Sequence, residues 1–338
     1  MRHRVCCGIL GVLFAALSAQ AEVPVPDHLA SQGVAQASVA QWLLRLHQSS
    51  RQQAYVGTFE VTAGPVKSAA RIWHVCEGAQ QIERVEALSG VARTTFRRND
   101  QVMTYLPDER VVIAEKRAAL GLFPNLINRA DVSIAQFYQL QTSEGAMVAG
   151  MKADVVQLQP RDHWRFAYRI WTEQTSGLVL KLQTLGPEQV VLEQAAFTDL
   201  QWAQPLNWVK LNAMMDNTAG YVIKQTELIS TTADKEGWSL KTMVPGFKTI
   251  SCVKRQESVK GIKASPLQWV LSDGLASVSL FIEPYDAVRH ARQLHDQMAF
   301  GATHMQTRRL DAWWLTALGE VPLMYLSVLF ICLVKGLQ

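Results

Sequence analysis

The chain is poor in cysteine, with five among 338 residues and no C-x-x-C pair. Two of them, Cys6 and Cys7, lie in an apolar N-terminal segment, which leaves Cys76, Cys252 and Cys332. An odd number of cysteines without paired spacing argues against a disulfide framework. A Cys76–Cys252 disulfide is one alternative, and unpaired buried thiols are the preferred one. We therefore expect the core to rest on apolar packing.

Signatures of enzymes and metalloproteins are also missing. The chain has no G-x-S-x-G elbow, glycine-rich phosphate loop or dinucleotide fingerprint. His290 and His295 are not spaced as a zinc-binding i, i+4 pair, and His74 and His163 lack the neighbours typical of metal ligands. Ser272–Gly274 is interpreted as a turn, not as a nucleophile site. We expect no catalytic residue, no metal and no cofactor.

An excess of charge of one sign is missing too. The 33 Lys and Arg exceed the 29 Asp and Glu by four, and the excess is +2 (33 − 2 − 29) without Arg2 and Arg4. So weak a field does not attract nucleic acid. We therefore expect no nucleic-acid partner.

Apolar runs long enough for a membrane span are not found in the body of the chain. The C-terminal run LMYLSVLFICLV, Leu323 to Val334, has twelve residues. As a helix it would reach about 18 Å, against a hydrocarbon core of about 30 Å. A buried strand or helix, or an altered reading frame near the gene's end, is preferred over a membrane-associated segment.

The N-terminus carries the pattern of an export signal. Arg2 and Arg4 flank the start of an apolar stretch, Val5–Leu17, and Ser18–Ala21 ends in small residues at the cleavage spacing. This pattern is typical of a secretory signal peptide over residues 1–21, whereas an uncleaved anchor would need a longer apolar stretch. We expect the periplasm as the compartment. The remaining 317 residues (338 − 21) suit two domains.

Alternating apolar and polar residues predict a series of strands between Ala54 and Leu200. The predicted strands are Tyr55–Thr62, Ala69–Val75, Gln81–Leu88, Ala92–Arg97, Gln101–Leu106, Arg110–Glu115, Met147–Leu158, a hairpin within Pro160–Leu185, and Val190–Leu200. Tight turns between them favour a large antiparallel sheet. Such a sheet twists and is expected to curl into an open barrel with helices in its mouth.

Helical and polar segments divide the chain. A helix is predicted over Val34–Ser49 and one or two short helices over Leu120–Leu140. The apolar stripe of the first helix contains Val39, Trp42, Leu43 and Leu46. Residues 212–237 are polar and are interpreted as a linker, although Tyr221–Ile229 has strand character. The predicted domains are a large one over 22–211 and a small one over 238–338.

The hairpin Pro160–Leu185 has one apolar and one basic face. Side chains alternate across a strand, and six apolar positions share the first face: Trp164, Phe166, Tyr168, Ile170, Leu178 and Leu180. We expect this face to be core or the wall of a ligand cavity, and in an open barrel the two overlap.

Arginines are expected on the opposite, basic face of that hairpin and on neighbouring strands. They are Arg161, Arg165 and Arg169, with Arg93, Arg97 and Arg98 elsewhere. Contact with lipid phosphates or with acidic groups of a partner is one interpretation. A solvated strand face with cross-strand salt bridges is the preferred one.

Many short motifs run in order along both predicted domains. They include YVGTF (Tyr55–Phe59), ERVEALSG (Glu83–Gly90), LQPRDHWRFAYRIW (Leu158–Trp171), EQAAFTDL (Glu193–Leu200), VPGF (Val244–Phe247), SDGLASVSLFIEP (Ser272–Pro284) and ALGEVP (Ala317–Pro322). From Tyr55 to Pro322 the chain resembles the RseB/MucB family of periplasmic regulators of an envelope-stress sigma factor. The apolar run after Pro322 departs from the family pattern.

The resemblance implies an α+β fold, with a large N-terminal open antiparallel β-barrel packed with helices, like a lipoprotein carrier, and a smaller C-terminal α+β domain. It implies binding to the periplasmic segment of a membrane-spanning anti-sigma factor, which shields that segment from the site-1 protease. Lipopolysaccharide or mislocalised lipoprotein would release it. In the small domain, Trp269, Leu271 and Phe281 are candidates for the partner surface, although most of them are expected in the core. A periplasmic lipid or lipoprotein carrier is the alternative, and a homo-oligomer is left open.

Overall fold

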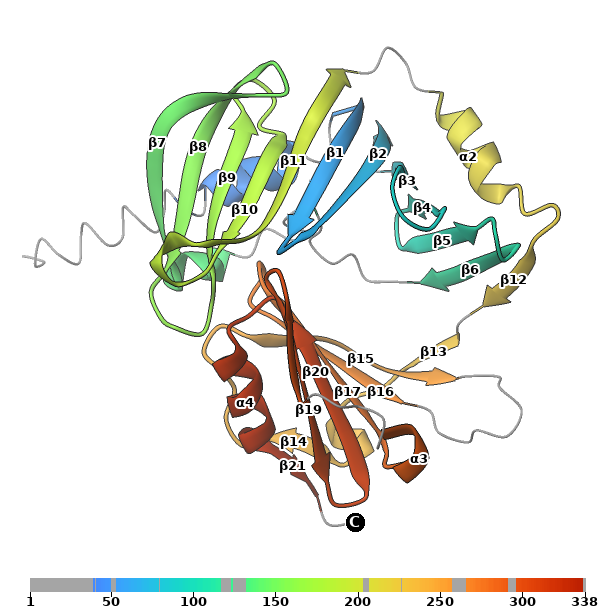
Figure 1. Ribbon diagram of the computed structural model, residues 1–338, viewed down its shortest axis with the longest axis vertical. Helices are drawn as coiled ribbons and strands as arrows, with labels where there is room; N and C mark the ends of the chain where they lie inside the picture. Colours follow the sequence, from blue (N-terminus) through green and yellow to red (C-terminus); the bar gives the residue numbers. More distant parts are fainter. Residues whose placement is uncertain are drawn as a thin grey trace, which may run out of the picture.

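The computed structural model describes residues 39, 41–49, 53–78, 80–116, 123, 132–202, 207–225, 227–256, 266–290 and 296–336. Two sheets, one of 12 strands and one of 7, form two domains that lie one above the other in Figure 1. The predicted signal peptide, residues 1–21, lies outside the described residues. No helix among the described residues is long and apolar enough to cross a membrane.

The large domain is built on the 12-stranded sheet, whose order is β12-β6-β5-β4-β3-β2-β1-β11-β10-β9-β8-β7. Its strands are β1 (Tyr55–Ala63), β2 (Val66–Glu77), β3 (Gln80–Ala87), β4 (Thr94–Arg98), β5 (Gln101–Leu106), β6 (Val111–Lys116), β7 (Tyr138–Val148), β8 (Met151–Pro160), β9 (Ala167–Glu173), β10 (Val179–Leu185), β11 (Val191–Trp202) and β12 (Val222–Gln225). All neighbours pair antiparallel except β12 with β6, which are parallel. Because β12 and β7 are free edges, the sheet is an open barrel, as predicted.

Helices fill the curve of this sheet. The helical residues 39 and 41–49 bury Val39, Leu43 and Leu46 against β8, β9 and β10, as the predicted stripe requires, while Trp42 is partly buried. The short 3-10 helix η1 (Val132–Gln136) adds Ile134 to the same cluster. The blue helix lies behind these strands in Figure 1. These helices cover the concave face of the sheet beside β8, β9 and β10. The part of the sheet next to the small domain is not covered by them.

The polar segment 212–237, predicted as a linker, contains the end of a helix, two strands and a short 3-10 helix. Residues 212–216 complete helix α2 (Trp208–Asp216), whose N-terminus is capped by the Asn207 side chain. Leu211 and Met215 pack on the β2–β6 half of the barrel. The chain then adds β12 to the large sheet and begins the second sheet with β13 (Glu227–Ser230). The strand character of 221–229 is therefore confirmed, split between two sheets.

The small domain is built on the 7-stranded sheet, in the order β13-β15-β16-β17-β20-β19-β18. Its other elements are η3 (Asp234–Glu236), β14 (Trp238–Leu240), β15 (Lys248–Gln256), β16 (Leu267–Ser272), β17 (Ser277–Pro284), α3 (Ala287–His290), β18 (Gln297–Phe300), β19 (Thr303–Leu310), β20 (Trp313–Gly319), α4 (Leu323–Cys332) and β21 (Leu333–Lys335). The apolar run after Pro322 is α4, which buries Leu326 and Leu329 against one face of this sheet. A buried helix was one of the predicted alternatives.

The three cysteines of the two domains, Cys76, Cys252 and Cys332, are unpaired. Burial raises the pKa of the Cys252 thiol to about 11, so it stays protonated at neutral pH. The interpretation as unpaired thiols is confirmed. Stability therefore rests on the apolar clusters of the two domains.

Candidate functional site at the junction of the domains

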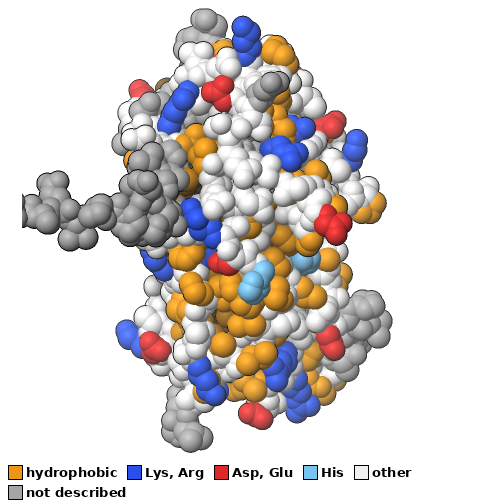
Figure 2. All heavy atoms as spheres, turned by 90° about the vertical axis from the view of Figure 1, so that its left-hand side faces the viewer, with side chains coloured by type: hydrophobic (Ala, Val, Ile, Leu, Met, Phe, Trp, Pro, Cys, Tyr) orange, Lys and Arg blue, Asp and Glu red, His pale blue; other side chains and the backbone are white. Residues whose placement is uncertain are grey.

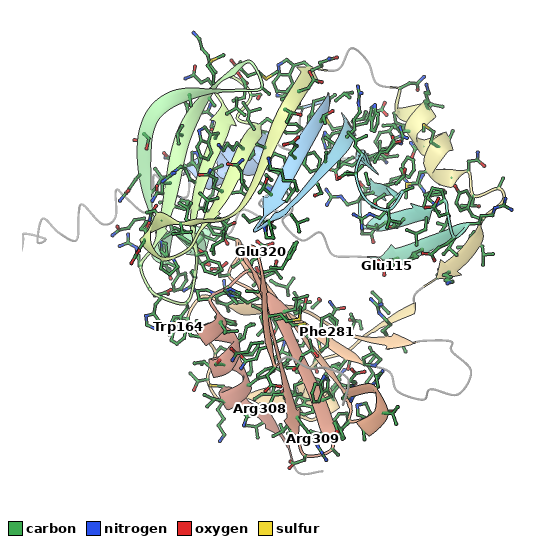
Figure 3. The ribbon with its side chains drawn as sticks, in the orientation of Figure 1. Glu115, Trp164, Phe281, Arg308, Arg309 and Glu320 are labelled. Carbon is green, nitrogen blue, oxygen red and sulfur yellow. The ribbon has the colours of Figure 1, made fainter. Side chains whose placement is uncertain are left out.

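Three loops at one end of the small sheet meet the large domain. They are the β16–β17 turn, the β18–β19 turn and the β20–α4 connection that carries Glu320. Figure 3 places Glu320 where the two ribbons approach one another. The first loop supplies Asp273 to Arg165, and the second supplies the backbone amide of Ala302 to the Glu193 carboxylate. The junction is therefore a polar and apolar interface built from both domains.

Arg165 is the centre of the polar part of this junction. Its Nε donates to Asp273 Oδ2 at 2.7 Å, and both side chains are almost fully buried, at 0% and 1% exposed. Its other nitrogens donate to Asp162 and to the carbonyl of Pro245. The guanidinium carbon lies 4.4 Å from the centre of the Phe137 ring. One arginine thus ties loops of both domains together.

Asp273 has further partners that hold it in place. Its Oδ1 accepts hydrogen bonds from the backbone N–H groups of Leu275 and Ala276, at 2.9 and 2.8 Å, so the predicted Ser272–Gly274 turn is confirmed. Tyr138 Oη donates to Oδ2 at 3.3 Å. Burial raises the pKa of Asp273, and Arg165 and the two amides act in the opposite direction. The turn therefore holds the Asp273 carboxylate at the position where it pairs with Arg165.

The predicted basic face is wrong for Arg165, which is buried and not solvated. The chain bends at residues 161–165 and β9 begins only at Ala167, so alternation does not apply there. Arg161 is exposed, and Arg169 donates to Gln157 Oε1 at 3.3 Å. Arg97 pairs across the strands with Glu83 at 3.1 Å, as the salt-bridge interpretation predicts.

Beside this network lies a cavity of about 230 Å³. It is lined by Phe59, Val61, Phe123, Tyr168, Ile170, Leu182, Thr184, Glu193, Ala195, Leu275 and Glu320. Of the predicted wall residues, Tyr168 and Ile170 line it, while Leu178 and Leu180 lie fully buried in the adjoining core. Leu275 and Glu320 come from the small domain, so this domain completes the wall.

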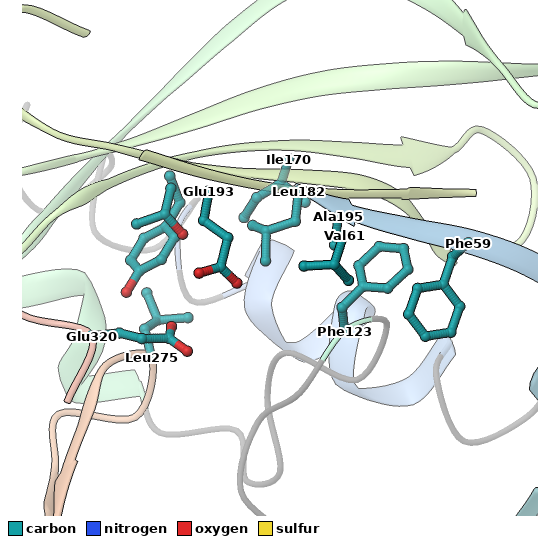
Figure 4. A pocket seen from close by; sticks show the side chains of 11 residues that line it. Phe59, Val61, Phe123, Ile170, Leu182, Glu193, Ala195, Leu275 and Glu320 are labelled. Atoms are coloured by element: carbon teal, nitrogen blue, oxygen red, sulfur yellow. The ribbon is translucent and has the colours of Figure 1, made fainter. Parts of the chain in front are cut away.

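Two carboxylates stand out among these apolar walls. Figure 4 shows Glu193, from β11, and Glu320, from the small domain, directed toward one another. Burial, and next the nearby Glu193 charge, raise the pKa of Glu320 to about 7. Burial also raises the pKa of Glu193, opposed by the Ala302 amide. With a pKa of about 7, the Glu320 carboxyl is close to half protonated at neutral pH, beside a second acid in a largely apolar space.

A second hollow, of about 420 Å³, lies on the surface between the domains. Phe166 and Pro160 of the large domain and His304, Leu323 and Met324 of the small domain are among its lining residues. The ring centres of Phe166 and His304 are 5.7 Å apart. Figure 2 shows histidine side chains among hydrophobic ones midway along this face. Phe166 thus lines this groove and not the cavity.

Comparison with known proteins shows a family match for both domains. The family model described as the MucB/RseB N-terminal domain matches residues 38–215, and the one described as the MucB/RseB C-terminal domain matches residues 232–330. The chain belongs to the MucB/RseB family. The N-terminal match ends within α2, which agrees with the placement of that helix in the large domain.

Individual members of the MucB/RseB family are similar over different shares of the chain. The sigma factor AlgU regulatory protein MucB of Pseudomonas aeruginosa is 28% identical over 295 residues, which cover 85% of this chain and 88% of the relative. The sigma-E factor regulatory protein RseB of Haemophilus influenzae is 20% identical over 46% of this chain and 50% of its own. A crystal structure of MucB in complex with MucA(peri) superposes with a TM-score of 0.66 at 24% identity, covering 88% of this chain and 99% of that chain.

The three residues predicted for a partner surface of this MucB/RseB chain differ in burial. Trp269 and Leu271 are 5% and 1% exposed within the small-domain core, which agrees with the expectation that most of these candidates belong to the core. Trp269 Nε1 donates to Thr249 Oγ1 at 2.9 Å inside the sheet. Phe281 follows the buried Leu280 on β17, so its side chain lies on the other face of the sheet from Trp269, where it is half-buried (Figure 3). It stays a prediction.

Trp164 also differs from its prediction. It precedes β9 and packs against the core of the small domain, with its ring centre 4.3 Å from that of His163. It is therefore an interdomain contact and does not line the cavity. Among the described residues, no group of three or more His, Cys, Asp or Glu is placed to hold a metal ion.

The residues of the junction that sequence reasoning did not single out as site residues are Asp273, Glu193 and Glu320. All three occur inside motifs that carry the family resemblance, EQAAFTDL, SDGLASVSLFIEP and ALGEVP. Motif membership was the only signal for them. Their pairing across the domain junction depends on the three-dimensional arrangement.

Proposed function

We propose that the chain is a periplasmic negative regulator of an envelope-stress sigma factor, which binds the periplasmic segment of a membrane-spanning anti-sigma factor. The observation that carries this proposal is the family match over both domains. The relative that covers most of the chain is named as a sigma factor regulatory protein, and a solved relative is in complex with MucA(peri). Residues of both domains meet at the junction, which supports binding of the segment by the two domains together.

The bound segment would be shielded from the site-1 protease. A protein bound along a peptide keeps it from the extended conformation that a protease needs, and it blocks access by its bulk. The buried ion pair between Arg165 and Asp273 supports this role, because contacts already formed between the domains reduce the conformational freedom that is lost on binding. Lipopolysaccharide or mislocalised lipoprotein would release the segment by competing for this protein.

A periplasmic lipid or lipoprotein carrier is the second candidate, and the cavity of about 230 Å³ favours it. The small domain separates the two functions. Leu275 and Glu320 of that domain complete the cavity wall, whereas a carrier would need only the barrel. We therefore prefer the regulatory function, with the cavity as part of it.

The proposal is tested by titrating the mature chain with the purified periplasmic segment of the anti-sigma factor in a calorimeter. A saturable one-to-one signal is expected, and lipopolysaccharide fragments should abolish it. A folded chain that gives no signal at micromolar concentration would contradict the proposal. A signal that survives the fragments would contradict the release step alone.

Phe281 offers a residue-level version of this test. Phe281→Ala removes a half-buried ring from the face of the small sheet that α4 does not cover, and about a tenfold loss of affinity is expected. Ile331→Ala is the matched control, because Ile331 is 69% exposed on α4, on the opposite side of the sheet. Equal affinity of the two variants would remove Phe281 from the partner surface.

A further inference from the structure

The cavity between the domains carries polar groups that its apolar walls do not explain. Glu193 comes from β11 of the large domain and Glu320 from the small domain, and they face one another (Figure 4). The influences on Glu320 are burial and Glu193, with no cation among them, and the Glu193 carboxylate accepts a hydrogen bond from the Ala302 amide. Among the described residues no cation acts on either acid, and two acids that face one another in a largely apolar space are unfavourable.

Tyr168 adds an independent observation at the same place. The ring lines the cavity, the side chain is 5% exposed, and its hydroxyl has no hydrogen-bond partner among the described residues. Burial, and next the Glu320 carboxylate, raise the pKa of this phenol well above its usual value, so the hydroxyl stays protonated. A buried hydroxyl without a partner costs free energy, and a ligand at this point would satisfy it.

The complement of these groups is a cation with several donors. A primary ammonium group has three N–H donors, and the cavity offers oxygen acceptors on Glu193, Glu320 and Tyr168. A guanidinium needs a planar fork of acceptors, whereas an ammonium suits acceptors from different directions. Phe59, Val61 and Leu182 provide an apolar wall beside the acids.

We propose that this cavity binds a primary ammonium group carried on a short apolar stem, held between Glu193 and Glu320. The ammonium group takes the place of the proton that the acid pair otherwise retains, and the stem lies on the apolar wall. Because the two carboxylates belong to different domains, the bound cation joins the domains. The cavity also excludes an anionic head group at this end, where it would meet two acids. This inference goes beyond the regulatory function and does not depend on it.

The test uses the mature chain and n-hexylamine, with hexanoate as a probe of the same stem and opposite charge. At about pH 8 the amine is protonated, as a lysine side chain is. Hexylamine should raise the melting temperature and give a saturable calorimetric signal, and hexanoate should do neither. Near pH 6 to 7 amine binding should release a proton, because the Glu320 proton is displaced, so the heat should depend on the ionisation enthalpy of the buffer.

Variants connect the signal to the two acids. Glu193→Gln with Glu320→Gln should weaken hexylamine binding by about tenfold or more and abolish the proton release. Glu60→Gln is the matched control, because Glu60 is exposed on β1 and does not line the cavity. A lysine side chain has the same chemistry, so Nα-acetyl-lysine amide is compared with its norleucine counterpart. Binding of this lysine derivative more tightly than hexylamine would identify a peptide side chain as the source, and the reverse a free amine.

Three results would overturn the proposal: no binding of either amine to the folded chain, equal hexylamine binding by the double variant, or equal binding of hexanoate. A failure of the anti-sigma segment to bind in calorimetry would not affect these amine-binding measurements, because they use the chain without the segment. The two proposals therefore fail separately.

Discussion

Arg165 and Asp273 form a buried ion pair across the two domains, with Nε and Oδ2 2.7 Å apart. Removing one partner from such a pair leaves an uncompensated charge. Arg165→Met should therefore lower the free energy of unfolding by roughly 3 to 5 kcal/mol in urea titrations. Arg165→Met with Asp273→Asn should recover part of that loss.

The matched control for this pair is Arg169→Met, because Arg169 on β9 donates hydrogen bonds to the neutral Gln157 side chain and has no ion pair with an acid among the described residues. It should cost less than about 1 kcal/mol. A change of similar size in the two single variants would show that Arg165 is not buried against Asp273 in solution.

Glu320 predicts a dependence of stability on pH. Its pKa is about 7 in the folded chain against 4.5 for an ordinary glutamic acid. The folded state therefore binds more protons between these values, and the free energy of unfolding falls as the pH rises from 4.5 to about 7. The upper limit of this loss is about 3 kcal/mol. Glu320→Gln should flatten the curve and stabilise the chain at about pH 8.

The contribution of Glu320 to the stability curve is separated from that of neighbouring groups by subtracting the curve of a variant. Glu193 from β11 and Tyr168 from β9 face it, and His304 Nδ1 lies 2.6 Å from the carbonyl oxygen of the next residue, Val321. The curve of Glu320→Gln is therefore subtracted from that of the unchanged chain. A difference curve without slope between 4.5 and 7 would contradict the burial of this acid.

Two tyrosines at the junction should respond in opposite ways to loss of the hydroxyl. Tyr138→Phe removes a hydrogen bond to Asp273 and should cost about 1 to 2 kcal/mol of unfolding free energy. Tyr168→Phe removes a hydroxyl without a partner among the described residues, so the stability should stay equal or rise by about 1 kcal/mol. Equal losses would show that Tyr168 has a hydrogen-bond partner in solution.

Gly246 allows the close approach of the small domain to Arg165. Its φ is +88°, and a Cβ there would lie 2.5 Å from Phe137 Cε2 and 2.6 Å from Arg165 Nη2. Gly246→Ala should lower the melting temperature and the unfolding free energy by about 2 kcal/mol or more. Gly220→Ala is the control, with φ +81° and nothing within 4 Å, so it carries only the backbone strain of about 1 to 2 kcal/mol. Equal losses of unfolding free energy in the two variants would show that neighbouring atoms can move to make room for a Cβ at residue 246.

Much of the large sheet follows from the alternation of its residues. β1, β3, β5 and β6 begin and end within one residue of their predictions. β7 was missed because it is an edge strand with a polar sequence, which leaves no apolar period to read. The strand character of Tyr221–Ile229 was visible in the sequence, but its division between β12 of one sheet and β13 of the other was not.

The site was less predictable than the fold. Alternation along Pro160–Leu185 puts Tyr168 and Ile170 in a wall, and they line the cavity. It misplaces Arg165, because the position of this side chain depends on Asp273, 108 residues further along the chain. The facing of Glu193 and Glu320 likewise arises from the docking of two domains, which no local pattern encodes.

The most direct test of the proposed function is the rate at which the site-1 protease cleaves the periplasmic segment of the anti-sigma factor at increasing concentrations of the mature chain. The rate should fall in a saturable way toward zero, with a midpoint at the calorimetric dissociation constant of the same segment. An unchanged cleavage rate in the presence of folded, saturating chain would contradict the account.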